Sequence, residues 1–172
     1  MPESVHRDAI VKEEILYKPF TLKRLTDYDP SVKSEGAGSL ITGKQLKEDI
    51  FDNVDMLFNS RSHASLADLG GYKEVEESVL AYGVMDFCGR QSSTASRDTL
   101  RAHIFKQLRL FEPRLDPASL VVEFKDAEKG DSTSVEYRIS GVIKVKGVDE
   151  EIAFISRLNL ESGNAELRLD GQ

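Results

Sequence analysis

The chain has 172 residues, a length typical of one globular domain with a short appended arm. Hydrophobic residues make up 40% of it and charged residues 31%, a composition that excludes a largely disordered chain. The net charge of −7 disfavours nucleic acid and anionic membranes as partners, one cysteine excludes an internal disulfide, and three histidines leave little for a zinc site.

The start of the chain is polar and charged, and it has no apolar segment behind a basic beginning. Nowhere do about 18 apolar residues follow one another. The sequence therefore predicts neither a signal peptide nor direct insertion into a membrane, and it predicts a cytoplasmic location.

Residues 1–40 are predicted to form an N-terminal arm and linker ahead of a main domain at residues 41–172. Apolar side chains gather at residues 16–25, and Pro30 then ends any helix, because a residue before proline avoids the α region. Glycines and serines dominate residues 31–39, as in a linker. The arm is too short to form a core alone, so it must dock onto the main domain or onto another protein.

A long helix is predicted from Thr42 onward. Thr42 and Gln45 have the spacing of a capping box, in which each side chain bonds the backbone N–H of the other residue. Apolar residues follow at helical spacing and define the buried stripe: Leu46, Ile50, Phe51, Val54, Leu57 and Phe58. Asn59 and Ser60 are typical of the end of a helix.

A short helix is expected over residues 75–82, where Gly83 ends it, and residues 86–94 are polar and turn-like. A second long helix is expected to start near Ser96, which can cap it, and to end at Pro113. Its buried stripe consists of Leu100, Ile104, Leu108 and Phe111.

Beyond Pro117 the apolar period changes from about 3.6 residues to 2. Alternating segments predict strands over residues 120–124, 135–145, 152–160 and 165–169. Because the links between them are short, neighbouring strands are expected to be antiparallel. The predicted fold class is α+β: two main helices plus a short one packed on an antiparallel meander of about four strands, with an N-terminal arm.

Few residue patterns indicate catalysis. Cys88 and His103 could be chosen as a nucleophile and its base, and Glu112 with Asp116 as the two carboxylates of a glycosidase. The simpler interpretation is an apolar thiol in a loop, a histidine on a helix flank and solvated acids. We therefore expect no catalytic residue, no metal and no cofactor.

Three basic residues, Arg138, Lys144 and Arg157, can share one face of the predicted sheet. They form either a solvated face of mixed charge or a patch for a partner, and the first interpretation is the simpler.

Glu112-Pro113-Arg114 forms a sharp corner between the second long helix and the first strand. In one interpretation it is an ordinary helix end, with Arg114 bonding the last carbonyl groups. In the other, Arg114 projects from the corner to bind a neighbouring molecule, while Glu112 is a surface residue whose change to glutamine alters stability little.

The corner resembles the Glu-Pro-Arg motif of the baseplate wedge subunit family of contractile phage tails. Three other segments match in order: residues 24–30 resemble Arg-Leu-x-Asp-x-Asp-Pro, residues 57–61 resemble Leu-Leu-Asn-Thr-Arg, and residues 78–86 resemble Ser-Val-Leu-Asn-Tyr-Gly-Leu-Pro-Asp. The resemblance covers about residues 22–170 and is closest to the TssE-type members of type VI secretion systems. Ala81 and Met85 depart from it.

This resemblance implies a structural role without catalysis, in a cytoplasmic baseplate with TssF, TssG and TssK. It also implies a platform on which the TssB/TssC sheath assembles by adding strands to a free sheet edge. No nucleic acid or small-molecule substrate is implied. A lysozyme-like glycoside hydrolase and a regulatory adaptor on the same fold are the alternatives.

Two groups of residues are expected to bind partners. The corner is implied by the resemblance, and the apolar side chains of the arm are expected to bind a TssF/TssG-like protein because a flexible linker separates them from the core. The predicted partner-binding residues are Glu112, Pro113, Arg114, Leu16, Phe20, Leu22 and Leu25.

Overall fold

The structure is a computed structural model, and it describes residues 15–27, 30–31, 33, 40–62, 72–85, 94–125, 133–146 and 148–171. The chain divides into two units, residues 1–46 and residues 47–172. Cys88 lies outside the described residues, as does the predicted turn-like segment except its last residue. The proposed pairing of Cys88 with His103 is therefore not described.

The first unit contains the predicted arm. Tyr17 and Ile41 form an antiparallel bridge, with both N–H···O=C distances 2.8 Å. Between them lies the short helix α1 (Thr21–Leu25), which the sequence did not predict. The capping box at the start of the next helix is confirmed: the Thr42 N–H lies 2.9 Å from Gln45 Oε1, and the Gln45 N–H lies 3.3 Å from Thr42 Oγ1.

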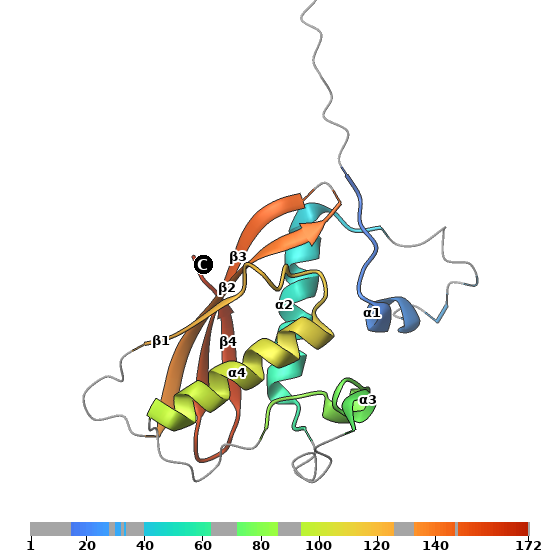
Figure 1. The fold of residues 1–172 in the computed structure, drawn as a ribbon. Coiled ribbons are helices and arrows are strands. Elements are labelled where there is room, and N and C mark those ends of the chain that lie inside the picture. The colour runs from blue at the N-terminus through green and yellow to red at the C-terminus, as the bar shows by residue number, and fades with distance from the viewer. Residues whose placement is uncertain are drawn as a thin grey trace, which may run out of the picture. The chain divides into compact units, whose positions relative to one another are not determined.

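The remaining elements are two long helices, two short ones and four strands. Their bounds are α2 (Gly43–Asn59), α3 (Lys73–Glu76), the 3-10 helix η2 (Val79–Ala81), α4 (Thr94–Phe111), β1 (Val121–Phe124), β2 (Ser134–Val145), β3 (Val148–Asn159) and β4 (Ala165–Leu169). The strands form one antiparallel sheet in the order β1-β2-β3-β4 (Figure 1). The predicted α+β class and the four-stranded meander are confirmed.

Both long helices pack on the same face of the sheet. From α2, the ring of Phe58 lies 6.3 Å from that of Tyr137, and the ring of Phe51 lies 6.3 Å from that of Phe154. From α4, the guanidinium of Arg101 lies 5.3 Å from the ring centre of Phe124, which stands opposite Tyr137 in the register. Burial raises the pKa of Tyr137 to about 12.

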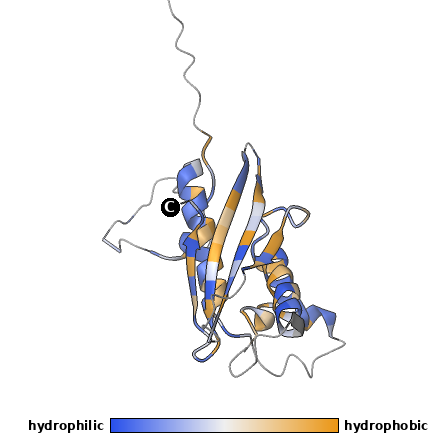
Figure 2. Ribbon diagram, turned by 90° about the vertical axis from the view of Figure 1, so that its left-hand side faces the viewer, coloured by the Kyte–Doolittle hydropathy of each residue, from blue (hydrophilic) through white to orange (hydrophobic). Residues whose placement is uncertain are grey.

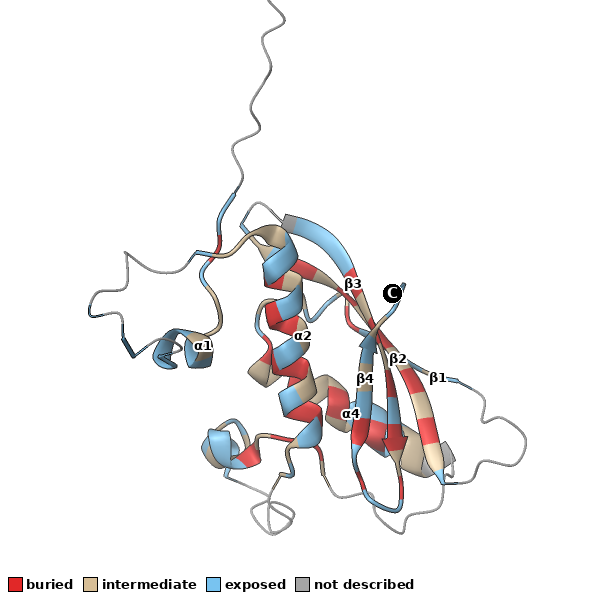
Figure 3. Ribbon diagram, turned by 180° about the vertical axis from the view of Figure 1, so that it is seen from behind, coloured by how far each residue is buried: buried red, intermediate tan, exposed pale blue. Residues whose placement is uncertain are grey.

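The buried stripes of the helices and strands follow the predicted periods. The four α2 residues Leu46, Ile50, Val54 and Leu57 and the three α4 residues Leu100, Ile104 and Leu108 are all at most 2% exposed. Along β2 and β3, buried residues alternate with more exposed ones (Figure 3), and hydrophobic residues alternate with hydrophilic ones in the same strands (Figure 2).

The outer sheet face carries the three predicted basic residues, each near an acid. Arg138 forms an ion pair with Asp170 at 2.7 Å, Lys144 lies 3.6 Å from Asp116, and Arg157 stands opposite Glu136 in the register. The face is therefore of mixed charge.

α4 begins at Thr94, close to the predicted start near Ser96. One helix prediction is wrong in detail. The expected helix over residues 75–82 is divided into α3 and η2. The break between them lies at Ser78. Its hydroxyl donates to the Val75 carbonyl at 2.8 Å and accepts from the Leu80 N–H at 3.3 Å, and these bonds compete with the backbone bonds of a helix.

No helix in the described part of the chain is long and apolar enough to cross a membrane.

Candidate functional site

The predicted corner lies where α4 gives way to the sheet. The last helical bond runs from the Glu112 N–H to the Leu108 carbonyl at 2.9 Å, and Pro113, which has no N–H, cannot continue the helix. The chain then turns onto β2: the Lys144 N–H donates to the Arg114 carbonyl at 2.7 Å, and the Asp116 N–H donates to the Val142 carbonyl at 2.9 Å. The corner is thus fixed to β2 before β1 begins.

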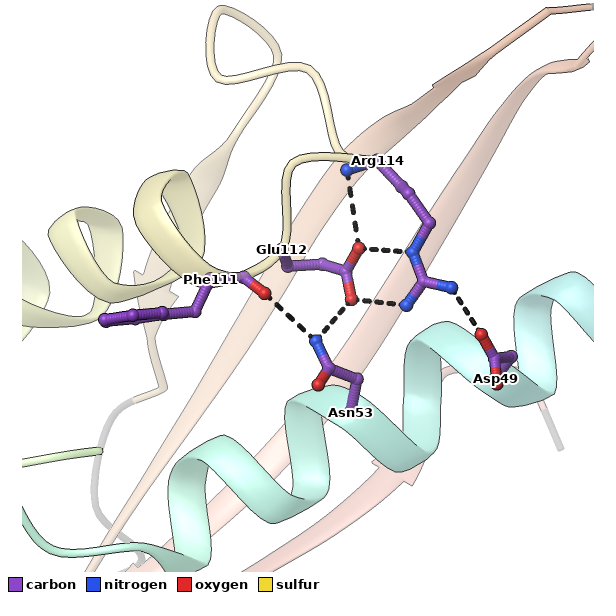
Figure 4. A network of polar contacts seen from close by, with 5 residues as sticks. All are labelled: Asp49, Asn53, Phe111, Glu112 and Arg114. Atoms are coloured by element: carbon purple, nitrogen blue, oxygen red, sulfur yellow. Dashed lines mark hydrogen bonds and ion pairs between the residues drawn. The ribbon is translucent and has the colours of Figure 1, made fainter. Parts of the chain in front are cut away.

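The side chains of the corner point inward, toward α2 (Figure 4). Arg114 donates two hydrogen bonds to the carboxylate of Glu112, from Nε to Oε1 at 2.6 Å and from Nη2 to Oε2 at 2.7 Å. Its Nη1 donates a third to Asp49 Oδ2. Asn53 Nδ2 donates to Glu112 Oε2 at 2.7 Å and to the Phe111 carbonyl at 3.1 Å. Asp49 and Asn53, which lie one helix turn apart on α2, therefore bond the side chains of both Arg114 and Glu112.

This cluster is buried. Glu112 is 0% exposed, Asp49 and Asn53 are each 2% exposed, and the side chain of Arg114 is 15% exposed. Burial alone would lower the pKa of Arg114, but the hydrogen bond and charge of Glu112, followed by those of Asp49, raise it above its usual value. The guanidinium therefore stays charged while it bonds the carboxylates of Glu112 and Asp49.

A buried, bidentate ion pair is costly to break. Replacing a whole buried pair by apolar residues is often neutral, but removing one partner leaves an uncompensated charge and costs about 3–5 kcal/mol. The corner therefore fastens α4 and β2 to α2.

The inward orientation contradicts two expectations for the corner. Glu112 is not a surface residue, so the premise of the small effect expected for its change to glutamine is wrong, and we expect a larger loss of stability. The expectation that Arg114 projects from the corner is also wrong, because its side chain is only 15% exposed and bonds the carboxylates of Glu112 and Asp49. Both errors have one cause: the sequence analysis did not consider Asp49 and Asn53, two polar residues of α2 that bond the side chains of the corner. Partner binding at this corner, where Pro113 is exposed, stays a prediction.

Sequence reasoning missed Asp49 and Asn53, although they carried a signal. They lie four residues apart and fall on the apolar stripe of α2, next to Ile50 and Val54. Acidic and amide groups at stripe positions need buried polar partners, which the corner supplies.

A second cluster brings together two segments that the resemblance had matched separately. The end of α2 and the segment after η2 meet in a parallel bridge between Arg61 and Val84, with the Val84 N–H 2.9 Å from the Ser60 carbonyl. Gly83 has φ +108°, and a Cβ there would lie 2.6 Å from the Ser60 oxygen, so only glycine fits.

Two side chains of α4 hold this segment from the other side. Gln107 Nε2 donates to the Ala81 carbonyl at 2.9 Å, and its Oε1 accepts from the Gly83 N–H at 3.1 Å. His103 Nε2 accepts from the Met85 N–H at 3.0 Å, and burial lowers the pKa of this histidine. The same nitrogen lies 3.2 Å from the Gly83 carbonyl, so His103 contacts the backbone on both sides of Val84.

The other candidate residues are also accounted for. Asp116 Oδ1 accepts from the Ala118 N–H at 3.2 Å, and both carboxylate oxygens of Glu112 are bonded within the corner cluster. Among the described residues, no group of three or more His, Cys, Asp or Glu side chains could hold a metal ion.

The arm exposes apolar side chains, whereas the corner buries polar ones. Leu16 and Leu22 are each 48% exposed and Leu25 is 78% exposed, while Phe20 is half-buried. Residues 15–25 contain three cations and no acid. Partner binding by these side chains stays a prediction, and their exposure is compatible with it.

Comparison with known families gives a match. The family model described as baseplate wedge protein gp25 matches residues 44–148, more than half of the chain, including α2 apart from Gly43, the corner and all of β2. Neither the search of curated proteins nor the search of solved structures found a match.

Proposed function

The chain belongs to the baseplate wedge protein gp25 family, and on this premise we propose that it is the TssE-like subunit of a type VI secretion baseplate. Membership of the family carries a structural role in the baseplate of a contractile, phage-tail-like system, in contact with other baseplate proteins. The type VI assignment adds specific partners: TssF, TssG and TssK in the wedge, and the TssB/TssC sheath above it. Its proposed location is the cytoplasm.

The family match over the corner is the observation that carries this proposal. The matched region contains Glu112, Arg114 and their α2 partners, and it ends at Val148, the first residue of β3. A wedge subunit must keep its shape while its neighbours exert force on it. A buried ionic fastening between helix and sheet suits that task, because separating it exposes charge without a partner.

We assign no catalysis to this chain. Both oxygens of Glu112 are bonded to Arg114, and one of them also to Asn53, so Glu112 is not poised to protonate a leaving group. Incubation of the purified chain with peptidoglycan should release no muropeptides. Turnover above a blank would favour the lysozyme-like alternative.

The proposed contact with TssF and TssG is the arm. Burying three side chains such as Leu16, Leu22 and Leu25 gives roughly 5–8 kcal/mol before the cost of ordering them. Deletion of residues 1–30 should therefore abolish co-purification with TssF and TssG and leave the fold of the remainder intact. Unfolding of the truncated chain would instead make the arm part of the core.

The proposed function is tested in a bacterium that carries the gene for this chain beside sheath genes. Deletion of the gene should abolish extended fluorescent TssB sheaths, and the gene supplied in trans should restore them. Pull-down of the tagged chain should recover TssF, TssG and TssK. Normal sheaths in the deletion strain would contradict the proposal, and recovery of only a signalling protein would favour the regulatory adaptor.

A further inference from the structure

The segment at residues 72–85, which contains α3 and η2, is fixed by hydrogen bonds along its length. On both sides of Val79, its backbone N–H groups donate to acceptors within the segment. Its last three N–H groups donate to Gln107, the Ser60 carbonyl and His103. We call this anchored part of the chain the η2 segment.

The η2 segment holds two neighbouring apolar side chains out in solvent. Val79 is 81% exposed and Leu80 is 65% exposed, whereas the next residue, Ala81, is buried. Ser78 caps this turn of 3-10 helix, because its hydroxyl accepts from the Leu80 N–H at 3.3 Å. The two side chains thus project from a rigid turn, and little backbone freedom is lost when a partner covers them.

The same segment is acidic. It contains Glu74, Glu76 and Glu77 and a single cation, Lys73. Glu76 forms an ion pair with Lys106 of α4 at 2.8 Å, while Glu74 and Glu77 are exposed. α3 packs against η2 and lies beyond the end of α2, on the side away from the sheet (Figure 1). Exposed carboxylates therefore accompany the exposed apolar pair.

We propose that the η2 segment is a docking site for an amphipathic helix of a neighbouring subunit, with lysine or arginine flanking its apolar face. A strand cannot pair here, because the N–H groups on both sides of Val79 are already bonded. The contact therefore runs through side chains. Val79 and Leu80 meet the apolar face of the helix, and Glu74 and Glu77 meet its cations. The inference rests on the proposed function, which supplies the neighbouring subunit.

The experiment uses the full chain and two synthetic eighteen-residue helical peptides. One has leucine on one face and lysine on the other, and the second has glutamate in place of lysine. The lysine peptide should shift the methyl NMR signals of Val79 and Leu80 and bind at least about tenfold more tightly than the glutamate peptide. Equal binding of the two peptides, or shifts confined to Leu22 and Leu25 of the arm, would overturn the proposal.

Charge reversal tests the acidic part of the site. Glu74→Lys with Glu77→Lys should transfer the preference to the glutamate peptide, because the docked helix then meets cations. The matched control, Glu48→Lys with Asp52→Lys, changes two exposed acids of α2 and shifts the net charge equally. It should keep the wild-type preference. The same transfer in both variants would reveal a response to net charge alone and contradict the proposal.

Removal of the apolar pair tests the other part. Both side chains are exposed, so Val79→Ser with Leu80→Ser should leave the unfolding transition unchanged and weaken binding of the lysine peptide at least about tenfold. Leu22→Ser with Leu25→Ser in the arm is the matched control and should bind like the wild type. Unchanged binding by the Val79/Leu80 variant contradicts the proposal.

Sedimentation of the full chain tests another occupant, the basic arm of a second copy. A dimer that is lost in both double-serine variants would assign the η2 segment to self-association and overturn the docking of a neighbouring subunit.

The same variants separate this inference from the proposed function. A folded Val79/Leu80 variant that still supports full sheath assembly in cells overturns the docking site alone. Selective binding of the lysine peptide, together with normal sheaths in the deletion strain, supports the docking site and overturns the type VI role.

Discussion

The corner at residues 111–116 and the arm at residues 15–25 distribute polar and apolar groups in opposite ways. The corner buries the carboxylate of Glu112 completely and satisfies it within the chain, whereas the arm leaves Leu25 78% exposed. A group satisfied inside the chain contributes to its own stability. An apolar group left in solvent gains only when a partner covers it. We therefore expect substitutions at the corner to act on folding, and we propose that substitutions in the arm act on assembly.

The largest effect on folding is expected at Arg114. Arg114→Ala leaves the Glu112 and Asp49 carboxylates buried without their cation and should lower the free energy of unfolding by about 3–5 kcal/mol. Arg114→Lys keeps the charge but not the planar fork, so its loss should be smaller. Urea unfolding measures both, with Arg109→Ala of α4 as a control that changes stability by less than about 0.5 kcal/mol. An Arg114→Ala chain as stable as wild type would show that the corner fastening is dispensable.

Gly83 comes next, because it tests the contact between the end of α2 and the segment after η2. Gly83→Ala should lower the free energy of unfolding by about 2–3 kcal/mol, through both positive φ and the clash with Ser60.

Two other glycines separate these causes. Gly171 also has positive φ, +99°, but open space around it, so Gly171→Ala should cost only about 1 kcal/mol. Gly43 lies in a helix with nothing within 4 Å of a Cβ, and Gly43→Ala should add about 0.5–1 kcal/mol. Equal losses at Gly83 and Gly171 would remove the clash from the explanation.

A smaller effect is expected from His103, whose pKa burial lowers in the folded state. The unfolded chain then binds the proton more readily, so stability is highest above the unfolded pKa of about 6.5 and falls as the pH drops below it. Between pH 7 and pH 5.5 the contribution of this histidine to the free energy of unfolding should therefore decrease as the pH falls.

His103→Gln supplies the comparison, because glutamine can still accept a bond from the Met85 N–H but cannot titrate in this range. Its unfolding free energy should depend less on pH over that interval than that of the wild type. The same slope in both proteins would assign the pH dependence to other groups.

The smallest effect on folding is expected in the arm. Leu22→Ser together with Leu25→Ser should change the free energy of unfolding by less than about 0.5 kcal/mol, because both side chains are exposed. The same double variant should lose co-purification with TssF and TssG. If the double variant is destabilised, the arm contributes to folding as the corner does.

The sequence predicted the elements whose signals are local. The capping box at Thr42 and Gln45 and the strand at residues 165–169 appear where the pattern placed them, because a helix cap and a two-residue alternation depend on near neighbours. The short helix over residues 75–82 was less predictable, since Ser78 competes with helical bonds only in one particular geometry.

The direction of the corner could not be predicted from its own residues. From the sequence alone, Glu112 and Arg114 are equally compatible with a surface position and with a buried one. Their burial follows only from Asp49 and Asn53, which face them from about 60 residues earlier in the chain.

Residues 47–60 of α2 and its end contact three separate parts of their unit. Asp49 and Asn53 hold the corner, Asn59 holds the start of β4, and Ser60 holds the segment after η2. α2 therefore links these parts mechanically. A force applied to β4 is transmitted to the α4 corner along the axis of α2 as well as across the sheet. Where neighbouring subunits pull on the chain, the lifetime of these contacts, set by the rate at which they break, matters more than their equilibrium stability.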